Sequence, residues 1–339
     1  MKVHVVSETQ FVTKGQGVHT AFIEHVELLK EKNDVKVVVN SEGLGDVMHS
    51  HTYGPYFFWK GLHYKGRRVF TVHVIPDSIK GSLPMWKYWY PIVKWYFKQV
   101  YSYADVCIAI SPTVEQAIRD LGSETEIVNI ANPIPIDRWK RTDEKRKKGR
   151  TMFNLSENDF VVLGVGQLEG RKGIDDFIDI AEAIPGAKFI WAGGRPFGAF
   201  TEGIKRLNER IAKASPHISF VGLIDLENMP YLYAAGDALL FPSFQENCPL
   251  APLEAAACGM PVVFRDLKEY TTLYEHPYLK AANKQEFIEL TRKLIHDQLF
   301  YQEGLKISDE LLTQFDKAAI REKLIVLYQS LIDTYCTNH

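Results

Sequence analysis

Short apolar strands alternate with amphipathic helices along this chain, and that alternation limits the possible fold more than any other feature. In the first half we predict strands at 3–7, 35–39, 47–51, 69–73 and 106–110, with a helix at 18–30. Such strands, separated by crossover helices, are typical of a parallel sheet covered on both faces. The sequence therefore predicts an α/β protein.

A polar, strongly basic stretch at 140–150 interrupts the alternation and has no apolar stripe, so we predict a linker there. The alternative is a long solvated loop inside one domain. The alternation then resumes, with strands at 160–165, 188–192, 218–221, 238–241 and 262–264 and a helix at 173–184. A chain of 339 residues is long enough for two domains. We predict domains at 1–145 and 146–315, and a C-terminal helix at 316–339 that packs back on the first domain.

Composition narrows the class of protein. The hydrophobic content of 46% and charged content of 24% are those of a soluble globular protein. No apolar run approaches the ~18 residues that span a bilayer, and the N-terminus has a strand pattern where a signal peptide would have an apolar core. The four cysteines have no Cys-x-x-Cys spacing, which indicates a reducing, cytoplasmic compartment without structural disulfides.

The formal net charge of −2 hides an uneven distribution. Residues 1–150 contain 22 Lys and Arg against 16 Asp and Glu, a charge of +6, and the remainder contain 18 against 26, a charge of −8. A basic half beside an acidic half indicates that one domain faces an anionic surface.

Two carboxylates, Glu246 and Glu254, flank the predicted start of a small-residue helix that follows the strand at 238–241. The N-terminus of a helix offers free backbone N–H groups and the positive end of the helix dipole, which suit a phosphate. Carboxylates beside it can accept hydrogen bonds from sugar or ribose hydroxyls. The segment therefore predicts a site for a sugar nucleotide, the alternative being two solvated helix carboxylates.

This segment resembles the E-x7-E element of the retaining family-4 glycosyltransferases, which have two Rossmann-like domains and an active site in the cleft between them (the GT-B fold). The resemblance implies that Glu254 holds the ribose hydroxyls and that Glu246 contacts the donor sugar or supports charge in the transition state. Asn247-Cys248-Pro249 replaces the family's Gly-x-Gly. Because Pro249 has no N–H group, Leu250 and its neighbours, with Cys248, are the expected donor-binding positions.

The segment from Gly166 to Gly173 resembles the family's Gly-Arg-Leu-x-x-x-Lys-Gly, whose Arg and Lys neutralise the donor diphosphate. Lys172 matches the lysine, whereas Gln167 stands where the family has arginine. A neutral amide cannot form a charge-assisted fork to phosphate. Either Arg171 supplies the missing charge or Lys172 acts alone; the alternative for Lys172 is a solvated lysine at a helix start.

Three other positions complete the site that the resemblance implies. Gly15 and Gly17, between a strand and a helix, match a glycine loop under the donor diphosphate or the acceptor, or else form an ordinary tight turn. His73 ends a predicted parallel strand and is expected beside the transferred sugar, the alternative being a core histidine. The backbone of Leu223 or Ile224 is expected to bind the uracil.

His49 and His51 form a His-x-His pair that suggests a metal site. We predict no metal, because no third ligand is close in the sequence and parallel strand ends explain both residues. The resemblance likewise implies no tightly bound cofactor, only a UDP-sugar donor as substrate.

An aromatic and basic segment at 84–101 is unusual for a soluble domain. Trp and Tyr favour bilayer interfaces and Lys attracts anionic headgroups. We predict membrane contact through Trp86, Lys87, Trp89, Lys94, Trp95 and Lys98. The alternative is a helix packed on the domain core with solvated lysines. Such a strip can also bind single-stranded nucleic acid, but no RNA-binding fold pattern accompanies it, so we predict no nucleic-acid partner.

Within family 4, the segments 264–270 and 278–281 and the glutamine at 167 are similar to bacterial diglycosyl-diacylglycerol synthases. That resemblance implies transfer of a hexose from UDP-glucose or UDP-galactose to monoglucosyl-diacylglycerol, at the inner face of the cell membrane, for a lipoteichoic-acid anchor. Two alternatives stay open. One is a transferase for another acceptor, such as a polysaccharide or an undecaprenyl-linked sugar; the other is a degenerate transferase that serves as a membrane scaffold.

Overall fold

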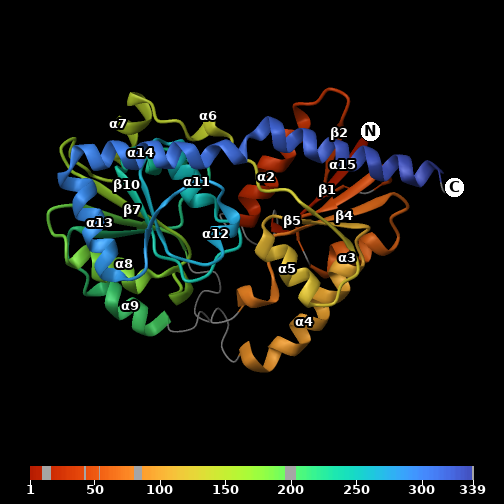
Figure 1. Ribbon diagram of the computed structural model, residues 1–339, viewed down its shortest axis with the longest axis horizontal. Coiled ribbons are helices and arrows are strands. Elements are labelled where there is room, and N and C mark those ends of the chain that lie inside the picture. Colours follow the sequence, from red (N-terminus) through yellow and green to blue (C-terminus); the bar gives the residue numbers. More distant parts are fainter. Residues whose placement is uncertain (10–16, 42, 53, 80–85, 195–203, 338–339) are drawn as a thin grey trace. The chain divides into compact units, whose positions relative to one another are not determined.

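The structure, a computed structural model, describes residues 1–9, 17–41, 43–52, 54–79, 86–194 and 204–337. The chain divides into two compact units (Figure 1). The N-terminal unit comprises Met1–Ser78, Lys87–Pro133 and Phe315–His339, and the C-terminal unit comprises Ile79–Trp86 and Ile134–Gln314. None of the described helices is long and apolar enough to cross a membrane.

The N-terminal unit contains a six-stranded parallel sheet of order β2-β1-β3-β4-β5-β6. Its strands are β1 (Lys2–Val6), β2 (Lys36–Val39), β3 (Val47–Ser50), β4 (Arg67–Val72), β5 (Val106–Ala109) and β6 (Glu126–Asn129). Its helices are α2 (Gly17–Lys30), α3 (Pro55–Leu62), α4 (Trp86–Ser102), α5 (Pro112–Asp120) and α15 (Lys317–Thr337), with a 3₁₀ turn at Pro76–Ile79. β3, β4 and β5 are buried along almost their whole length, which accounts for their continuous apolar sequence.

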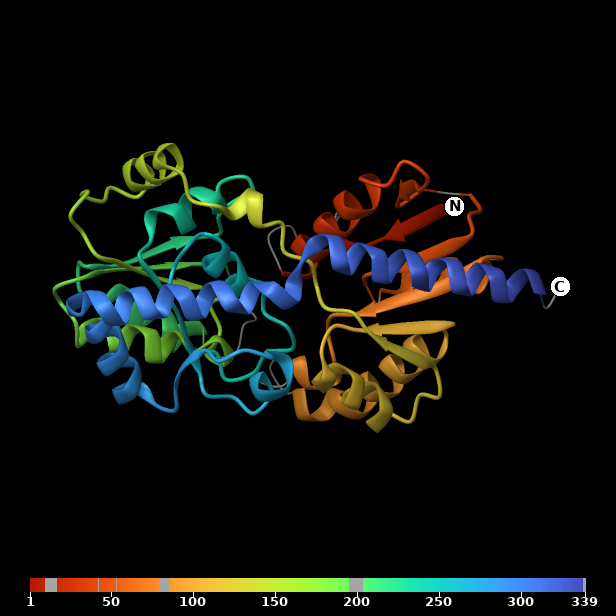
Figure 2. The same ribbon diagram turned by 45° about the horizontal axis from the view of Figure 1, so that its top comes forward.

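Helix α15 belongs to the N-terminal unit although it ends the chain. Ile320, Leu324 and Tyr328 are buried in one cluster with Val3 and Phe22. Figure 2 shows this helix lying along the strands of the unit. Arg321 adds a 2.6 Å ion pair to Glu31 after α2.

The C-terminal unit contains a second six-stranded parallel sheet of order β12-β11-β10-β7-β8-β9. Its strands are β7 (Val161–Val165), β8 (Lys188–Ala192), β9 (Ile218–Gly222), β10 (Ala238–Phe241), β11 (Val262–Arg265) and β12 (Leu279–Ala281). Its helices are α6 (Ile136–Trp139), α7 (Asp143–Met152), α8 (Ile174–Glu182), α9 (Ile204–Ala212), α10 (Met229–Ala235), α11 (Leu250–Ala257), α12 (Tyr270–Leu273), α13 (Lys284–His296) and α14 (Gln298–Leu312), with 3₁₀ turns at Gly170–Lys172 and Thr313–Phe315. The expected α/β class and the two Rossmann-like sheets are confirmed.

The prediction of a linker at 140–150 is wrong. Most of that stretch is α7, whose N-cap is Thr142 and which packs on α10. The chain divides after Pro133, earlier than the predicted boundary at 145/146. Asp237 accepts from Arg146 at 2.7 Å and from Arg150 at 2.8 Å, so ion pairs take the place of the apolar stripe that marks most helices.

With the units divided in this way, the N-terminal unit does not have the positive net charge of residues 1–150. The residues of the N-terminal unit include 16 Lys and Arg and 16 Asp and Glu, so its formal charge is zero. Half of the +6 charge of residues 1–150 came from α7, whose five Lys and Arg against two Asp and Glu give +3, and α7 lies in the other unit. Any attraction to an anionic surface is therefore local: α4 carries Lys87, Lys94 and Lys98 and no acidic residue.

In each sheet the strand order reverses at one point, between β1 and β3 in the first and between β7 and β10 in the second. Loops that follow the two strands at such a point run in opposite directions and leave a crevice at the carboxyl edge of the sheet, where ligands of open α/β sheets bind. The side chains of interest gather at both of these points.

Candidate active site

The loops after β7 and β10 meet at the strand-order reversal of the C-terminal unit. Lys172 donates to Glu246 Oε1 at 2.5 Å, and Ser243 Oγ donates to the same oxygen at 2.7 Å. The structure thus brings two of the predicted catalytic residues into direct contact. The Lys172 side chain is 16% exposed, and burial lowers the pKa of its ammonium while the carboxylate of Glu246 opposes that shift.

Two glycines allow these loops to approach so closely. Gly173 adopts φ +72°, and a Cβ there would lie 2.1 Å from the Pro242 carbonyl oxygen. Gly193, after β8, adopts φ +151°, and a Cβ there would lie 1.8 Å from the Gly166 carbonyl oxygen. Any other residue at either position would push the loop after β7 away from its neighbours.

Arg171 takes part in the structure of this crevice. Its guanidinium donates to Glu169 Oε1 at 2.6 Å and to the Gln245 carbonyl at 3.0 Å. Glu169 is 1% exposed, so the pair is a buried clamp between the two loops. Gln167, which replaces the family arginine, is half-buried in the same loop.

Helix α11 begins at Leu250 with Pro249 as its N-cap. Helix geometry leaves the first N–H groups, those of Leu250 and Ala251, without an intrahelical acceptor. Cys248 and Leu250 are both 8% exposed. The start of α11 thus offers backbone donors for an anion, in the loop region that contains Glu246.

Glu254 lies on the second turn of α11 and is 6% exposed. The Tyr233 hydroxyl, from α10, donates to its Oε2 at 2.6 Å. Burial, with the charge of Glu254, raises the pKa of Tyr233 well above its ordinary value, so this hydroxyl stays a donor. Tyr233 therefore fixes the orientation of the predicted ribose-binding carboxylate.

Leu223 follows β9 and is 58% exposed. Gly222 before it adopts φ +73° and accepts at 2.8 Å from the N–H of Gly193, so the ends of β8 and β9 are joined. The segments 264–270 and 278–281 contribute an aromatic cluster in which the ring centroid of Phe264 lies 5.4 Å from that of Tyr270 and 5.4 Å from that of Tyr278. After burial, the charge of Glu246 is the next cause of the raised pKa of Tyr270, which places this cluster near the crevice.

Four buried histidines gather at the strand-order reversal of the N-terminal unit. His51 Nδ1 and His73 Nε2 share a 2.9 Å hydrogen bond, and their rings are stacked at 5.2 Å. His49 stacks on the other side of His51 at 4.7 Å. His25, from α2, contacts both with ring centroids at 4.4 and 4.6 Å.

The C-terminal helix completes this cluster. The Tyr328 hydroxyl lies 3.0 Å from His25 Nε2 and 2.5 Å from His49 Nδ1, and His49 Nε2 lies 2.6 Å from Thr71 Oγ1. Burial lowers the pKa of His25 to about 3 and of His73 to about 3, and it lowers the pKa of His49 and His51 as well. All four rings are therefore neutral near pH 7.

The His-x-His pair has no third ligand close in the sequence, but it has one close in space. His25 supplies a third ring, and the candidate ligand atoms of His25, His49 and His51 lie within 4.8 Å of one another. Both ring nitrogens of His49, however, already take part in hydrogen bonds. A metal would have to displace Tyr328 or Thr71, so the arrangement is a hydrogen-bonded network as it stands.

The predicted glycine loop is only partly described. Gly15 lies outside the described residues, and Gly17 is the first residue of α2. A Cβ at Gly17 would meet no heavy atom of the described chain within 4 Å. Packing of the described residues therefore does not require glycine at this position.

Sequence reasoning missed Tyr233, Ser243, His25 and Tyr328. Ser243 lies within the motif around Glu246, so its position was a usable signal. His25 and Tyr328 gave none, because they are far in sequence from His49 and reach it only through the packing of α2 and α15. Tyr233 is likewise an ordinary apolar-face residue of α10 when it is considered by itself.

Helix α4 is amphipathic as predicted, with Phe97, Val100 and Tyr101 buried. Trp89 is 57% exposed and Trp95 63% exposed, and the three lysines are exposed as well. Pro91 lies inside the helix. Its outward side therefore combines aromatic rings with positive charge.

Comparison with known proteins places the chain in a wider group. Residues 159–297 match the family model described as glycosyl transferases group 1, and residues 45–138 match that described as glycosyltransferase family 4. The chain is 34% identical over 295 residues to an alpha-galactosylglucosyldiacylglycerol synthase of Streptococcus pneumoniae, covering 85% of this chain and 79% of that one. It is 27% identical over 304 residues to a processive diacylglycerol alpha-glucosyltransferase of Acholeplasma laidlawii, covering 88% and 89%.

Solved structures show the same fold. The Anabaena protein Alr3699/HepE in complex with UDP and glucose superimposes with a TM-score of 0.78 at 20% identity, over 97% of this chain and 100% of that one. Sucrose-phosphate synthase from Thermosynechococcus elongatus gives a TM-score of 0.80 at 17% identity, over 98% and 100%. At these identities the likeness concerns the fold alone.

Proposed function

The chain belongs to the family-4 glycosyltransferases, enzymes of the GT-B fold, and we propose that this member transfers a hexose from a UDP-sugar to monoglucosyl-diacylglycerol. The observation that carries the proposal is the 34% identity, over most of both chains, to a synthase whose name specifies a galactosylglucosyl-diacylglycerol product. The buried Lys172–Glu246 pair beside a helix N-terminus supports it, because a transferase needs a site of that chemistry for its donor.

We assign the donor to the C-terminal unit. Lys172 and the first N–H groups of α11 supply positive charge for the diphosphate. Glu254, held by Tyr233, accepts from the ribose hydroxyls, and the backbone at Leu223 contacts the uracil. Arg171 is committed to Glu169 and Gln245, so Lys172 serves the diphosphate without a second cation from this loop.

The reaction we propose retains the configuration of the donor carbon. The bond from that carbon to the diphosphate breaks, and the acceptor hydroxyl oxygen bonds to the same face of the sugar. The acceptor proton passes to a departing phosphate oxygen. The protein contributes by holding the reactants and by stabilising the negative charge that develops on the phosphate.

We assign the acceptor and the membrane to the N-terminal unit. His73, which His51 holds by a 2.9 Å hydrogen bond, is a neutral polar group for the transferred sugar. Trp86, Lys87, Trp89, Lys94, Trp95 and Lys98 of α4 form the membrane contact, with the enzyme peripheral on the inner face of the cell membrane.

A lipid-product assay tests the function. Purified protein is mixed with anionic liposomes that carry either diacylglycerol or monoglucosyl-diacylglycerol, with UDP-glucose or UDP-galactose in parallel, and mass spectrometry identifies the lipids. We expect a dihexosyl lipid from the monoglucosyl acceptor alone, with one of the two donors preferred. A monohexosyl product from diacylglycerol would contradict the second-step assignment.

The assay also separates the alternatives. Turnover of the donor with no glycolipid from either acceptor would point to an undecaprenyl-linked or polysaccharide acceptor. No turnover at all, together with UDP binding that Glu254→Ala does not weaken, would favour a membrane scaffold.

A further inference from the structure

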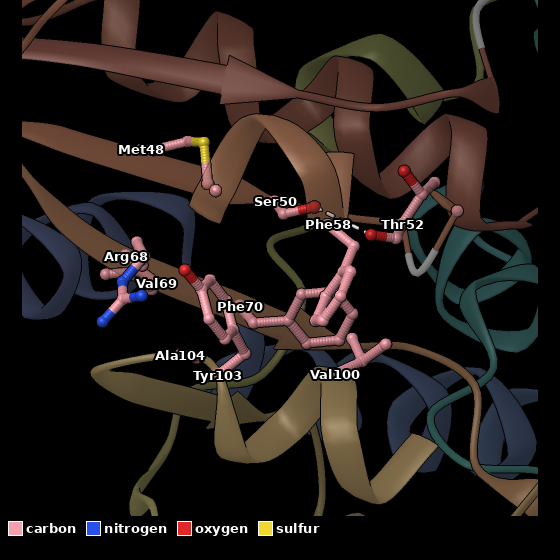
Figure 3. Close-up of a pocket in the computed structure, with 12 residues that line it drawn as sticks. Met48, Ser50, Thr52, Phe58, Arg68, Val69, Phe70, Val100, Tyr103 and Ala104 are labelled. Carbon is pink, nitrogen blue, oxygen red and sulfur yellow. Dashed lines mark hydrogen bonds between the residues drawn. The ribbon is translucent and has the colours of Figure 1, made fainter. Parts of the chain in front are cut away.

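A pocket in the N-terminal unit is lined by none of the clustered histidines and by none of the residues assigned above. It lies between β3 and β4 on one side and α3 and the end of α4 on the other, with an empty volume of about 360 Å³ that is partly open to solvent. Figure 3 shows Phe58, Phe70 and Val100 projecting into it.

The wall of this pocket is mostly apolar along its length. Val69, Phe70 and Val100 are at most 7% exposed. At one end Arg68 contributes its aliphatic stem, while its guanidinium bonds Asp105 at 3.2 and 3.3 Å and stacks on Tyr103 at 4.4 Å. That cation is therefore committed, and the pocket does not offer it to an anionic ligand.

The other end of the pocket is polar and lies at the carboxyl edge of the sheet. Ser50 Oγ donates to the Thr52 carbonyl at 2.8 Å, and Thr52 Oγ1 accepts from the Glu8 N–H at 3.0 Å. His51, which lies between these two residues in the sequence, points to the other face of the sheet, where it bonds His73. From Met48 to Thr52 an extended chain rises by about 13 Å, so the pocket runs along one face of the sheet and ends at its carboxyl edge.

The helices that cover the pocket also carry exposed apolar side chains. Trp59 and Leu62 of α3 are 65% and 42% exposed, and Trp89, Ile92 and Trp95 of α4 are 57%, 57% and 63% exposed. Phe58 and Gly61 of α3 and Val100 of α4 line the pocket itself. The apolar surface thus continues from the outer side of both helices to the space beneath them.

We propose that this pocket receives one acyl chain of the membrane lipid acceptor, with the glycerol end at Ser50 and Thr52. The inference rests on the proposed function, since it names how the acceptor is held. It also adds α3, through Trp59 and Leu62, to the membrane contact that the sequence assigned to α4 alone. Lifting one chain out of the bilayer would bring the sugar headgroup to the carboxyl edge of the sheet, where His73 follows β4.

Photolabelling tests the pocket directly. The whole enzyme is bound to liposomes that contain monoglucosyl-diacylglycerol with a diazirine in one acyl chain, irradiated, digested and analysed by mass spectrometry. We expect labels on Phe58, Val100 or Met48. Labels confined to the exposed Trp89 and Trp95 would overturn the proposal.

A variant tests the consequence for turnover. Val100→Phe fills the pocket, and Val326→Phe makes the same change at a 67% exposed position of α15. The measured quantity is the ratio of kcat/KM for a long-chain acceptor to that for a water-soluble, short-chain one. Because burial of one methylene is worth about a fourfold change in affinity, we expect Val100→Phe to lower this ratio about tenfold or more.

Equal ratios for Val100→Phe and Val326→Phe would overturn the proposal, provided that both variants unfold at the wild-type temperature. If Val100→Phe does not fold, the labelling pattern of the wild-type enzyme decides. The two experiments distinguish failure of the acyl-chain site from failure of the proposed acceptor. A dihexosyl product with labels outside the pocket overturns the acyl site alone, whereas pocket labels without that product support the site and overturn the proposed acceptor.

Discussion

The ion pair between Lys172 and Glu246 joins two loops that are 74 residues apart in the sequence. Glu246 holds the lysine in place before a donor arrives, and Ser243 orients the carboxylate. A bound diphosphate would compete with Glu246 for the ammonium group. In the proposed reaction the lysine would thus be positioned in advance, which reduces the reorganisation needed as charge develops on the leaving group.

Lys172→Met should lower kcat about 100-fold or more, because loss of one preorganised charge donor typically costs that much. Lys188→Met, an exposed lysine at the start of β8, is the matched control and should leave kcat unchanged. Steady-state kinetics with the lipid acceptor measure both. A loss below threefold in Lys172→Met would remove this residue from the assigned machinery.

Tyr233→Phe tests how Glu254, the carboxylate that we propose binds the ribose, is held. Removal of the hydroxyl leaves Glu254 without its 2.6 Å donor, and we expect UDP to bind about 5- to 10-fold more weakly, since such a bond contributes about 1 kcal/mol. Tyr231→Phe, on the same helix, should bind UDP as the wild type does. Calorimetric titration with UDP measures both, and equal affinity for all three proteins would contradict the role.

At the scale of elements, α4 shows how one helix can serve the core and a surface. Phe97, Val100 and Tyr101 are buried, while Trp89, Trp95 and the three lysines are exposed. The unit that carries it has no net charge. In the membrane contact that we propose, the attraction therefore comes from this helix and its neighbour α3 and not from the net charge of the whole unit.

The double variant Trp89→Ser with Trp95→Ser should weaken binding to anionic liposomes at least about tenfold, because each lost side chain contributes 1–2 kcal/mol or more of apolar burial. Binding of the wild type should also weaken as salt rises. Leu299→Ser, which is 84% exposed on α14, is the control. Sedimentation with vesicles gives the affinities, and unchanged binding of the double variant would exclude α4 as the contact.

Helix α7 is held to its unit by a buried carboxylate. Asp237 accepts from Arg146, from Arg150 and, at 2.8 Å, from the Val161 N–H at the start of β7. Asp237→Asn should lower the free energy of unfolding by about 3–5 kcal/mol, because it leaves buried guanidinium charge uncompensated. Asp143→Asn, exposed in the first turn of α7, should cost less than about 1 kcal/mol. The free energy of unfolding of both variants is measured by urea titration of the C-terminal unit's transition. Equal values for the two variants would show that Asp237 does not hold α7 in place.

At the scale of the whole molecule, acid should affect the two units differently. His25 and His73 have a pKa of about 3 in the folded unit and about 6.5 when unfolded. Between these values the unfolded chain binds more protons, so stability is fully present above about pH 6.5 and falls as the pH drops, by up to about 1.4 kcal/mol per pH unit for each histidine.

Hydrogen exchange measured at pH 6.5 and pH 5 distinguishes the units. We expect amides of β1, β3 and β4 to lose protection at pH 5, after correction for intrinsic exchange, and amides of β7 and β10 to keep theirs. The protein should also lose transferase activity over the same range. Equal protection of both units at the two pH values would show that the histidine cluster is not buried and neutral as described.

The sequence by itself determined the fold class and most of the strands, because apolar runs and turn residues act locally and each element can be recognised alone. It also singled out Lys172, Glu246 and Glu254 as candidate site residues, two of which the structure brings into contact. It failed at α7, whose stabilising partner Asp237 is a single carboxylate far along the chain and leaves no periodic signal.

Only the tertiary structure decided which side chains meet. The order of strands, which no local pattern encodes, places the loops after β7 and β10 side by side and so pairs Lys172 with Glu246. The same is true of His49, which reaches Tyr328 across 279 residues, and of the pocket beneath α3 and α4. Each is a contact between elements, and its geometry exists only once the whole unit has packed.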